Sequence, residues 1–275
     1  MRIPILTYHA ANVAGDEYAG NDHLALQADL RVIDSMGLRI VSLDRVIALL
    51  DSREAAPAQP CVALTFDDGT DYDVRPLDYP PHGVQPGFLP ILRAFRDEVG
   101  SRQPELHATC FVIASPAARA AMDEKCLFGT DIMGEDWWKP AADEGLLGIG
   151  NHSWDHNHDV APEDAPDGLP RGGFHAVDNA VRAQWQIDRA QAYIESRVAP
   201  HPVRHFGYPY GDANAYLSTQ YLPQHGPGLG LAAAYTTEGR HAVPDDNRWA
   251  LPRYVCGLHW RSPDRLRELL AESQA

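Results

Sequence analysis

The sequence lacks the features that mark exported, membrane-spanning or cysteine-rich proteins. Its N-terminal apolar run, residues 3–8, is too short for a signal peptide or a membrane-spanning helix. It contains four cysteines, and no two of them form a C-x-x-C pair, which disfavours disulfides and cysteine-ligated zinc. We therefore expect a cytoplasmic protein with reduced thiols and no membrane partner.

Basic residues and linkers are also scarce. The chain has 23 Lys and Arg against 38 Asp and Glu, a net charge of −15, and such a surface repels nucleic-acid phosphates. Nucleic acid is therefore not expected as a partner. No Gly/Ser-rich linker or low-complexity stretch divides the 275 residues, and 44% of them are hydrophobic, enough for a full core. We predict one domain over residues 1–275 and make no prediction of oligomeric state.

Short runs rich in β-branched residues alternate with helical patterns, which is typical of βα units around a parallel sheet. Strands are predicted at residues 3–8, 38–41, 62–66, 107–113, 146–150, 205–208 and 232–235. Helices are predicted at residues 24–36, 44–50, 88–99, 135–144, 177–198 and 263–272. No G-x-G-x-x-G follows a strand, so we predict an α/β fold with a distorted or incomplete (β/α) barrel of about seven parallel strands. Functional groups of such barrels lie at the carboxyl ends of the strands.

Two adjacent acids follow the predicted strand 62–66. Asp67 and Asp68 precede Gly69, which allows the chain to turn. Two unpaired neighbouring carboxylates repel each other, and a divalent cation would let both stay ionised. A turn with two solvated acids is an equally simple interpretation of this dipeptide alone.

Three histidines lie within seven residues after the predicted strand 146–150. They are His152, His156 and His158. Imidazole and carboxylate are the ligands that zinc prefers, and other first-row divalent ions bind them too. A polar loop with incidental histidines is the alternative, and we assign His158 to it. Because both clusters follow strands of one predicted barrel, Asp68, His152 and His156 could hold one cation with a position left for water, while Asp67 stays free as a base.

An aromatic and proline turn follows the predicted strand 205–208. Its sequence over residues 206–211 is FGYPYG. Such a turn can point a backbone N–H toward a substrate and stabilise an oxyanion, although it can also simply pack.

These segments together resemble the polysaccharide deacetylase family, also called carbohydrate esterase family 4, which has a NodB-homology domain. The resemblance rests on residues 65–69 (TFDDG), 107–112 (HATCFV), 152–156 (HSWDH) and 206–211, and it extends roughly over residues 1–255. It implies that Asp67 is the catalytic base and that the Tyr210 N–H helps form an oxyanion hole. It also implies that Asp68, His152 and His156 bind Zn²⁺ or another first-row divalent cation such as Co²⁺, Ni²⁺ or Mn²⁺.

The sequence departs from this family in two places. Family members often have an arginine where Gly207 stands, and that arginine holds the base. Arg253 could replace it, or could be an ordinary surface arginine. The general acid is a histidine in a late Leu-x-His motif in many members, but it comes from an N-terminal Tyr-His strand in the permuted poly-N-acetylglucosamine deacetylase branch. Both His9 and His259 are therefore candidates, and we favour His9 because it ends a predicted strand.

The resemblance implies a metal-dependent hydrolase that removes an N-acyl group, most simply N-acetyl, from an amino sugar or oligosaccharide. Water activated at the metal would lose a proton to Asp67 and attack the amide, and a histidine would protonate the departing amine. One alternative is a non-sugar amidohydrolase that acts on a small cyclic or formyl amide. Another is an inactive carbohydrate-binding or sensor protein with the same fold, for which a free acid at Asp67 would have no use.

Overall fold

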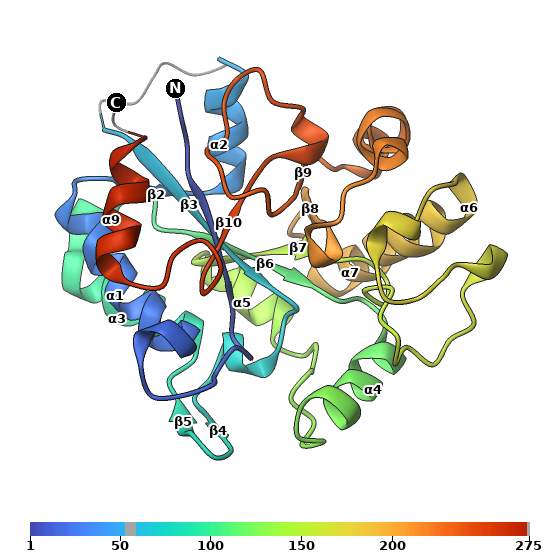
Figure 1. Ribbon diagram of the computed structural model, residues 1–275, viewed down its shortest axis with the longest axis horizontal. Helices are drawn as coiled ribbons and strands as arrows, with labels where there is room; N and C mark the ends of the chain where they lie inside the picture. The colour runs from blue at the N-terminus through green and yellow to red at the C-terminus, as the bar shows by residue number, and fades with distance from the viewer. Residues whose placement is uncertain (53–58, 274–275) are drawn as a thin grey trace.

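The computed structural model describes residues 1–52 and 59–273 of the chain (Figure 1). The main sheet contains the strands β1 (Ile5–His9), β2 (Arg39–Val41), β3 (Cys61–Asp67), β6 (Ala108–Val112), β7 (Leu147–Asn151), β8 (His205–Gly207), β9 (Ala233–Tyr235) and β10 (Tyr254–Val255). A separate antiparallel hairpin consists of β4 (Leu77–Tyr79) and β5 (Gly83–Gln85).

The main sheet is parallel and runs in the order β10-β1-β3-β6-β7-β8-β9. Strand β2 pairs with the beginning of β3, and β6 pairs with its later residues. All seven predicted strands are present, and the predicted α/β barrel architecture is confirmed. The hairpin β4–β5 and the short strand β10 were not predicted from the sequence.

A short segment after β9, residues 251–255, brings the two edges of the sheet together, and we call it the closing segment. At its start Leu251 pairs in parallel with Tyr235 of β9. At its end Tyr254 and Val255 form β10, which pairs with Leu6 and Thr7 of β1. This one segment therefore connects β9 to β1 and completes the distorted barrel.

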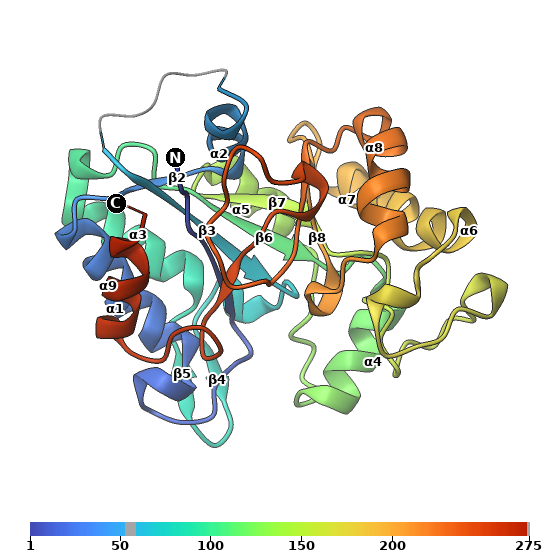
Figure 2. The same ribbon diagram turned by 45° about the horizontal axis from the view of Figure 1, so that its top comes forward.

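Helices cover the outside of the sheet, as Figures 1 and 2 show. The longer helices are α1 (Asp22–Ser35), α3 (Phe88–Val99), α4 (Pro116–Cys126), α7 (Arg189–Val198) and α9 (Pro263–Ala271). The remaining helices are α2 (Leu43–Leu50), α5 (Trp138–Glu144), α6 (Ala180–Ala183) and α8 (Leu222–His225). Helix α6 continues into α7 through a π-helical turn at Gln184–Asp188, so the predicted helix 177–198 is largely present. No helix in the described part of the chain has both the length and the apolar character needed to cross a bilayer.

Helix α4 was not predicted, although its N-terminus has strong capping residues. The Ser115 side chain accepts a hydrogen bond from the Ala118 N–H, and Pro116 occupies the first helical position. Alanines fill much of the helix and give it a weak apolar periodicity, which explains why the sequence pattern did not reveal it. The predicted helix 135–144 is shorter than expected, because the helical residues begin at Trp138.

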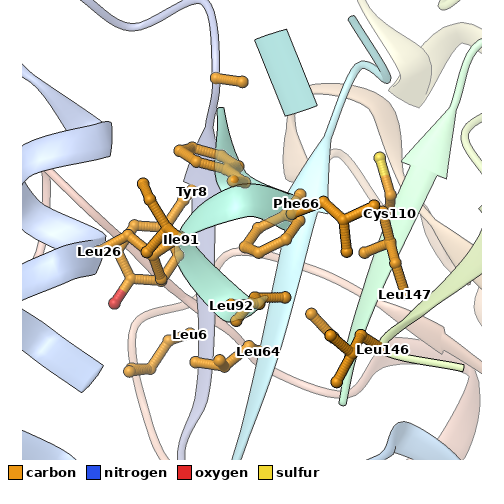
Figure 3. Packing of buried hydrophobic residues seen from close by; sticks show 14 of the residues in the cluster. Leu6, Tyr8, Leu26, Leu64, Phe66, Ile91, Leu92, Cys110, Leu146 and Leu147 are labelled. Carbon is orange, nitrogen blue, oxygen red and sulfur yellow. The ribbon is translucent and has the colours of Figure 1, made fainter. Parts of the chain in front are cut away.

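The largest part of the core lies between the sheet and the outer helices. Alternate residues of β1 and β3, among them Leu6, Tyr8, Leu64 and Phe66, point outward to meet α1 and α3 (Figure 3). Because side chains alternate along a strand, the residues between them face the barrel interior. This register directs Asp67, the last residue of β3, to the interior at the carboxyl end of the barrel.

Candidate functional site

The ends of β1, β3 and β10 and the loops that follow β7, β8 and β9 surround one pocket at the carboxyl end of the barrel. Its volume is about 340 Å³, and we call it the central pocket. Its lining includes most of the residues singled out in the sequence: His9, Asp67, Asp68, His152, His156 and Tyr210. The remaining lining residues are Gly211, Thr237, Val255 and Leu258.

Asp68, His152 and His156 form the three-residue cluster that was expected to hold a metal. One ligand atom from each residue lies within 4.8 Å of the other two. Asp68 Oδ1 is 3.6 Å from His152 Nε2 and 3.7 Å from His156 Nε2. These separations are too long for hydrogen bonds but approach the spacing of about 3.3 Å between ligands that each bind zinc tetrahedrally at about 2.0 Å. The donor set and its spacing therefore fit a first-row divalent cation.

Hydrogen bonding and burial prepare both imidazoles for this role. His152 Nδ1 lies 2.8 Å from the Gly207 carbonyl oxygen. A carbonyl can only accept, so Nδ1 carries the proton and Nε2 presents a lone pair toward Asp68. Burial lowers the pKa of His156 well below its ordinary value, and the neighbouring His152 adds to this shift. Both rings are thus suited to act as neutral ligands.

Unusual backbone conformations are concentrated at the same place. Eight non-glycine residues in the described part of the chain have a positive φ. Five of them lie beside the central pocket or in the loop that carries the histidines: Asp68, Ser153, His156, Asn157 and Tyr210. This conformation costs on the order of 1 kcal/mol or more per residue and persists where the surrounding structure enforces it. The loops are therefore held in shapes that an unconstrained chain would avoid.

Buried polar residues that the sequence analysis missed hold these loops in place. The Asp73 carboxylate accepts hydrogen bonds from the backbone N–H and the hydroxyl of Thr70, 2.7 and 3.1 Å away, and so fixes the turn after Asp68. Asp155 accepts hydrogen bonds from Arg171 and Gln186, each at 2.6 Å, between the two histidine ligands. The Thr70–Asp73 pair has the local spacing of a capping box, which the sequence analysis did not use. The partners of Asp155 lie 16 and 31 residues away, too far for a local pattern to reveal them.

Gly69 allows the turn after the two acids to pack against the neighbouring strand. Its φ is +72°, and a Cβ atom there would lie 2.6 Å from Cγ1 of Val112 at the end of β6. Both facts require glycine at this position. The glycine of the TFDDG motif therefore has a packing role in addition to its conformational one.

Asp67 is held by Arg253 and is not part of the three-residue cluster. Arg253 donates from one guanidinium nitrogen to Asp67 Oδ1 at 2.7 Å and from the other to Oδ2 at 2.8 Å. Burial alone would raise the pKa of Asp67, but the charge of Arg253, with smaller contributions from His152 and His9, holds that pKa well below its usual range. Asp67 is therefore ionised at neutral pH.

The structure explains why an arginine does not stand at residue 207. A Cβ atom on Gly207 would lie 2.9 Å from the ring of Phe111, so the ring occupies the space that a side chain would need. Arg253 enters from the closing segment instead, with its guanidinium 5.1 Å from the centre of the same ring. Its side chain is fully buried, and its Nε donates to the Thr236 carbonyl. The alternative of a surface arginine is therefore wrong.

The two candidate acids lie in different surroundings. His9 Nε2 is 4.0 Å from Asp67 Oδ2, and the side chain is one third exposed at the central pocket. His259 instead accepts a hydrogen bond from the Val255 N–H through Nδ1, and its ring packs against Tyr254. It does not line the central pocket, whereas its neighbour Leu258 does. The structure therefore brings His9, and not His259, beside Asp67.

Tyr210 lies at the mouth of the pocket. Its φ is +60° within a short 3₁₀ turn, Pro209–Gly211, which directly follows β8. The residue is 44% exposed, and its ring lies edge-on to the His156 ring, with 4.4 Å between ring centres. This places the backbone of the turn beside the proposed ligands.

Comparisons with known proteins agree with this architecture. The model of the family described as "Polysaccharide deacetylase" matches residues 54–226. No curated protein matches the sequence significantly. Among solved structures, the chain is similar to the Streptococcus pyogenes deacetylase PplD in complex with acetate, with a TM-score of 0.64, 20% identity, and 98% of each chain covered.

Two further structures have comparable similarity. One is IcaB from Ammonifex degensii, with a TM-score of 0.61, 18% identity, and 100% of this chain and 97% of that chain covered. The other is a de-N-acetylase from Aggregatibacter actinomycetemcomitans, with a TM-score of 0.62, 17% identity, and 97% of this chain and 100% of that chain covered. These likenesses establish a shared fold. Because the family model spans more than half of the residues, the chain belongs to the polysaccharide deacetylase family.

Proposed function

We propose that the protein is a metal-dependent hydrolase that removes an N-acetyl group from an amino sugar or from an oligosaccharide that contains one. The observation that carries this proposal is that two adjacent acids have different partners. Asp68 faces the two imidazoles, whereas Asp67 is ionised and held by Arg253. A site that merely bound a metal would have no use for the second, separately held acid.

The cation would be held by Asp68, His152 and His156. Zn²⁺ suits this donor set, and Co²⁺, Ni²⁺ or Mn²⁺ could replace it. When bound, such an ion polarises the amide carbonyl and makes water more acidic.

The residues around it supply the proton transfers. Asp67 accepts a proton from the attacking water, because it is ionised and Arg253 fixes its orientation. The Tyr210 backbone N–H donates to the oxygen that becomes negative when water adds to the carbonyl. His9, which lies beside Asp67, donates a proton to the departing nitrogen. A new C–O bond forms, the C–N bond breaks, and the products are acetate and a free amine.

The comparisons support acetate as the product, and the position of His9 supports its role as the acid. The PplD structure contains acetate, and the A. actinomycetemcomitans protein is described as a de-N-acetylase. His9 ends β1, which agrees with the proposed place of this chain in the permuted poly-N-acetylglucosamine deacetylase branch.

Acetate release from N-acetylglucosamine oligomers tests the proposal. The purified protein should release acetate, a chelator should abolish release, and added Zn²⁺ or Co²⁺ should restore it. Asp67→Asn should keep the bound metal and lose activity by roughly 1,000-fold or more. Stoichiometric metal without turnover, across oligomers and small cyclic or formyl amides, would instead identify a binding protein, and turnover of the small amides alone would identify a non-sugar amidohydrolase.

A further inference from the structure

A second pocket adjoins the central pocket beside the proposed ligands. It has a volume of about 200 Å³ and shares Asp68, His156 and Tyr210 with the central pocket. We call it the α4 pocket, because α4 and the residues after it form much of its wall. Its other lining residues are Ala11, Thr70, Ile113, Met122, Cys126, Leu127, Met133 and His158.

The wall of the α4 pocket away from the ligands is apolar. Ile113, Met122 and Met133 form a small hydrophobic cluster that is separate from the larger ones, and Leu127 packs against it. Methionine side chains are flexible and polarisable, so they suit surfaces that adapt to an apolar ligand. Protein interiors contain few voids larger than a water molecule, and an apolar cavity of about 150 Å³ is already large enough to bind benzene. A volume of about 200 Å³ is therefore more than a packing defect.

Buried ion pairs and hydrogen bonds fix this wall. Arg119 of α4 is 4% exposed, donates to the Met133 carbonyl at 2.6 Å, and forms an ion pair with Glu135. Asp123 of α4 accepts a hydrogen bond from the Asp131 N–H at 2.7 Å. The loop that carries Met133 is thus tied to α4, and the pocket is formed before any ligand arrives. A preformed apolar pocket favours binding because few side chains or loops lose conformational freedom when the ligand binds.

Resting on the proposed deacylase function, we infer that the α4 pocket is a subsite for an apolar group of the substrate, attached within a few bonds of the amide that is cleaved. The shared residues require this closeness, because Asp68, His156 and Tyr210 line both pockets. The volume suits a phenyl ring or an alkyl chain of about six carbons. The apolar group that occupies the pocket could be a longer acyl chain or a substituent on the amine side of the amide.

Two substrate series separate these sources. The first compares N-acetyl-, N-butanoyl- and N-hexanoylglucosamine, and the second compares the methyl, hexyl and phenyl glycosides of N-acetylglucosamine. Each buried methylene should raise kcat/KM by roughly fourfold, so one series should show a gain on the order of tenfold or more. A gain in the first series places the acyl chain in the pocket, and a gain in the second places the amine-side group there. Flat kcat/KM values in both series would overturn the inference.

A pair of tryptophan variants links any gain to the α4 pocket. Cys126 is exposed and lines the pocket, so Cys126→Trp should fill it and bring the ratio of kcat/KM for the long and short substrates close to one. Ala120, another exposed residue of α4, does not line the pocket, and Ala120→Trp should leave the ratio and the activity on N-acetylglucosamine unchanged. A ratio that survives Cys126→Trp would place the apolar group elsewhere and contradict the inference.

Alkylation of Cys126 gives a readout that does not depend on catalysis. Of the four cysteines, all within the described residues, Cys126 is the exposed one. N-hexanoylglucosamine or the phenyl glycoside should slow its reaction with iodoacetamide at least threefold, as measured by mass spectrometry, and N-acetylglucosamine should slow it less. Protection without turnover of any substrate would refute the hydrolase but retain an apolar binding pocket. Turnover with flat series and no protection would retain the hydrolase and refute the subsite.

Discussion

Arg253 and Asp67 are 186 residues apart in the sequence and form a buried, bidentate ion pair, with one hydrogen bond to each carboxylate oxygen. The pair requires a planar donor, because the two bonds arise from two nitrogens of one guanidinium. Removal of the arginine would leave the Asp67 carboxylate buried without a counter-charge, which typically lowers the free energy of unfolding by about 3 to 5 kcal/mol. The stability of the barrel and the ionisation of Asp67, the proposed base, therefore depend on the same ion pair.

Arg253→Lys should test this pair without removing the charge. A lysine can make one of the two bonds but cannot orient the carboxylate, so kcat should fall by roughly 10- to 100-fold with a smaller change in KM. Arg253 lowers the pKa of Asp67 in the folded protein, so weaker pairing should raise that pKa and move the acidic limb of the kcat profile to higher pH. A pH profile identical to that of the parent would show that Arg253 does not control Asp67. Thermal melting, measured alongside, separates this effect from loss of fold.

Metal content provides a direct check of the ligand set. The protein should bind about one divalent ion per chain, and His152→Ala should reduce the content to below about a tenth of that, because two protein ligands hold zinc far more weakly than three. His201→Ala is a matched control, since His201 pairs with Asp143 and lines neither the central pocket nor the α4 pocket. Elemental analysis after dialysis measures both variants. Full occupancy in His152→Ala would rule out this ligand assignment.

The identity of the general acid can be decided with two leaving groups. His9→Ala should lower deacetylation of N-acetylglucosamine oligomers by roughly 100-fold or more, because the amine must be protonated as it leaves. Hydrolysis of 4-nitrophenyl acetate should change much less, since nitrophenolate leaves without a proton. His259→Ala should have little effect on either substrate, given its hydrogen bond to the Val255 N–H. The opposite pattern, with His259 essential and His9 dispensable, would transfer the role to the late motif.

His23 should make the fold sensitive to mild acid. Burial lowers the pKa of His23 to about 4, and the hydrogen bond to the Ala10 carbonyl opposes this shift only in part. The unfolded chain takes up this proton near its ordinary pKa of about 6.5, so the stabilisation is complete above that pH and is lost as the pH falls toward 4. Between about pH 7 and pH 5, His23 should account for a loss of about 2 kcal/mol.

Denaturant unfolding at the two pH values measures this contribution. His23→Gln keeps a donor for the Ala10 carbonyl but cannot titrate in this range, so its free energy of unfolding should fall less between pH 7 and pH 5. Equal losses in the parent and the variant would show that other groups determine the acid sensitivity. Buried histidines with lowered pKa values elsewhere, such as His107, remain in both proteins and so cancel in the comparison.

Local sequence patterns predicted the parts of the site that depend on a few neighbouring residues. Asp67 and Asp68 lie between an apolar run and a glycine, and His152 and His156 follow another apolar run, so the strand-end position of each group could be predicted. Parallel strands then bring those ends to one edge of the barrel, as the barrel fold requires. The positions of the proposed ligands were therefore predictable without knowledge of a single long-range contact.

Features that depend on packing between distant segments could not be predicted in this way. The Phe111 ring packs against Gly207, and the buried Arg253 packs against that ring. No local sequence pattern indicates that an arginine at residue 253 takes the place of one at residue 207. The α4 pocket combines Ile113, which directly follows β6, with Met122 from α4 and Met133 from the loop after α4. Strand β10 has two residues, too few for a periodic signal, although it completes the barrel.

The position of the closing segment late in the chain determines when the protein can first carry out the proposed hydrolysis. It follows every other strand of the barrel in the chain, and it carries Arg253 between its contacts with β9 and β1. During synthesis, the three proposed ligands are all present long before the partner of Asp67 emerges from the ribosome. A nascent or partly opened molecule therefore has an Asp67 without its counter-charge, and the proposed chemistry must wait until the last strand has docked.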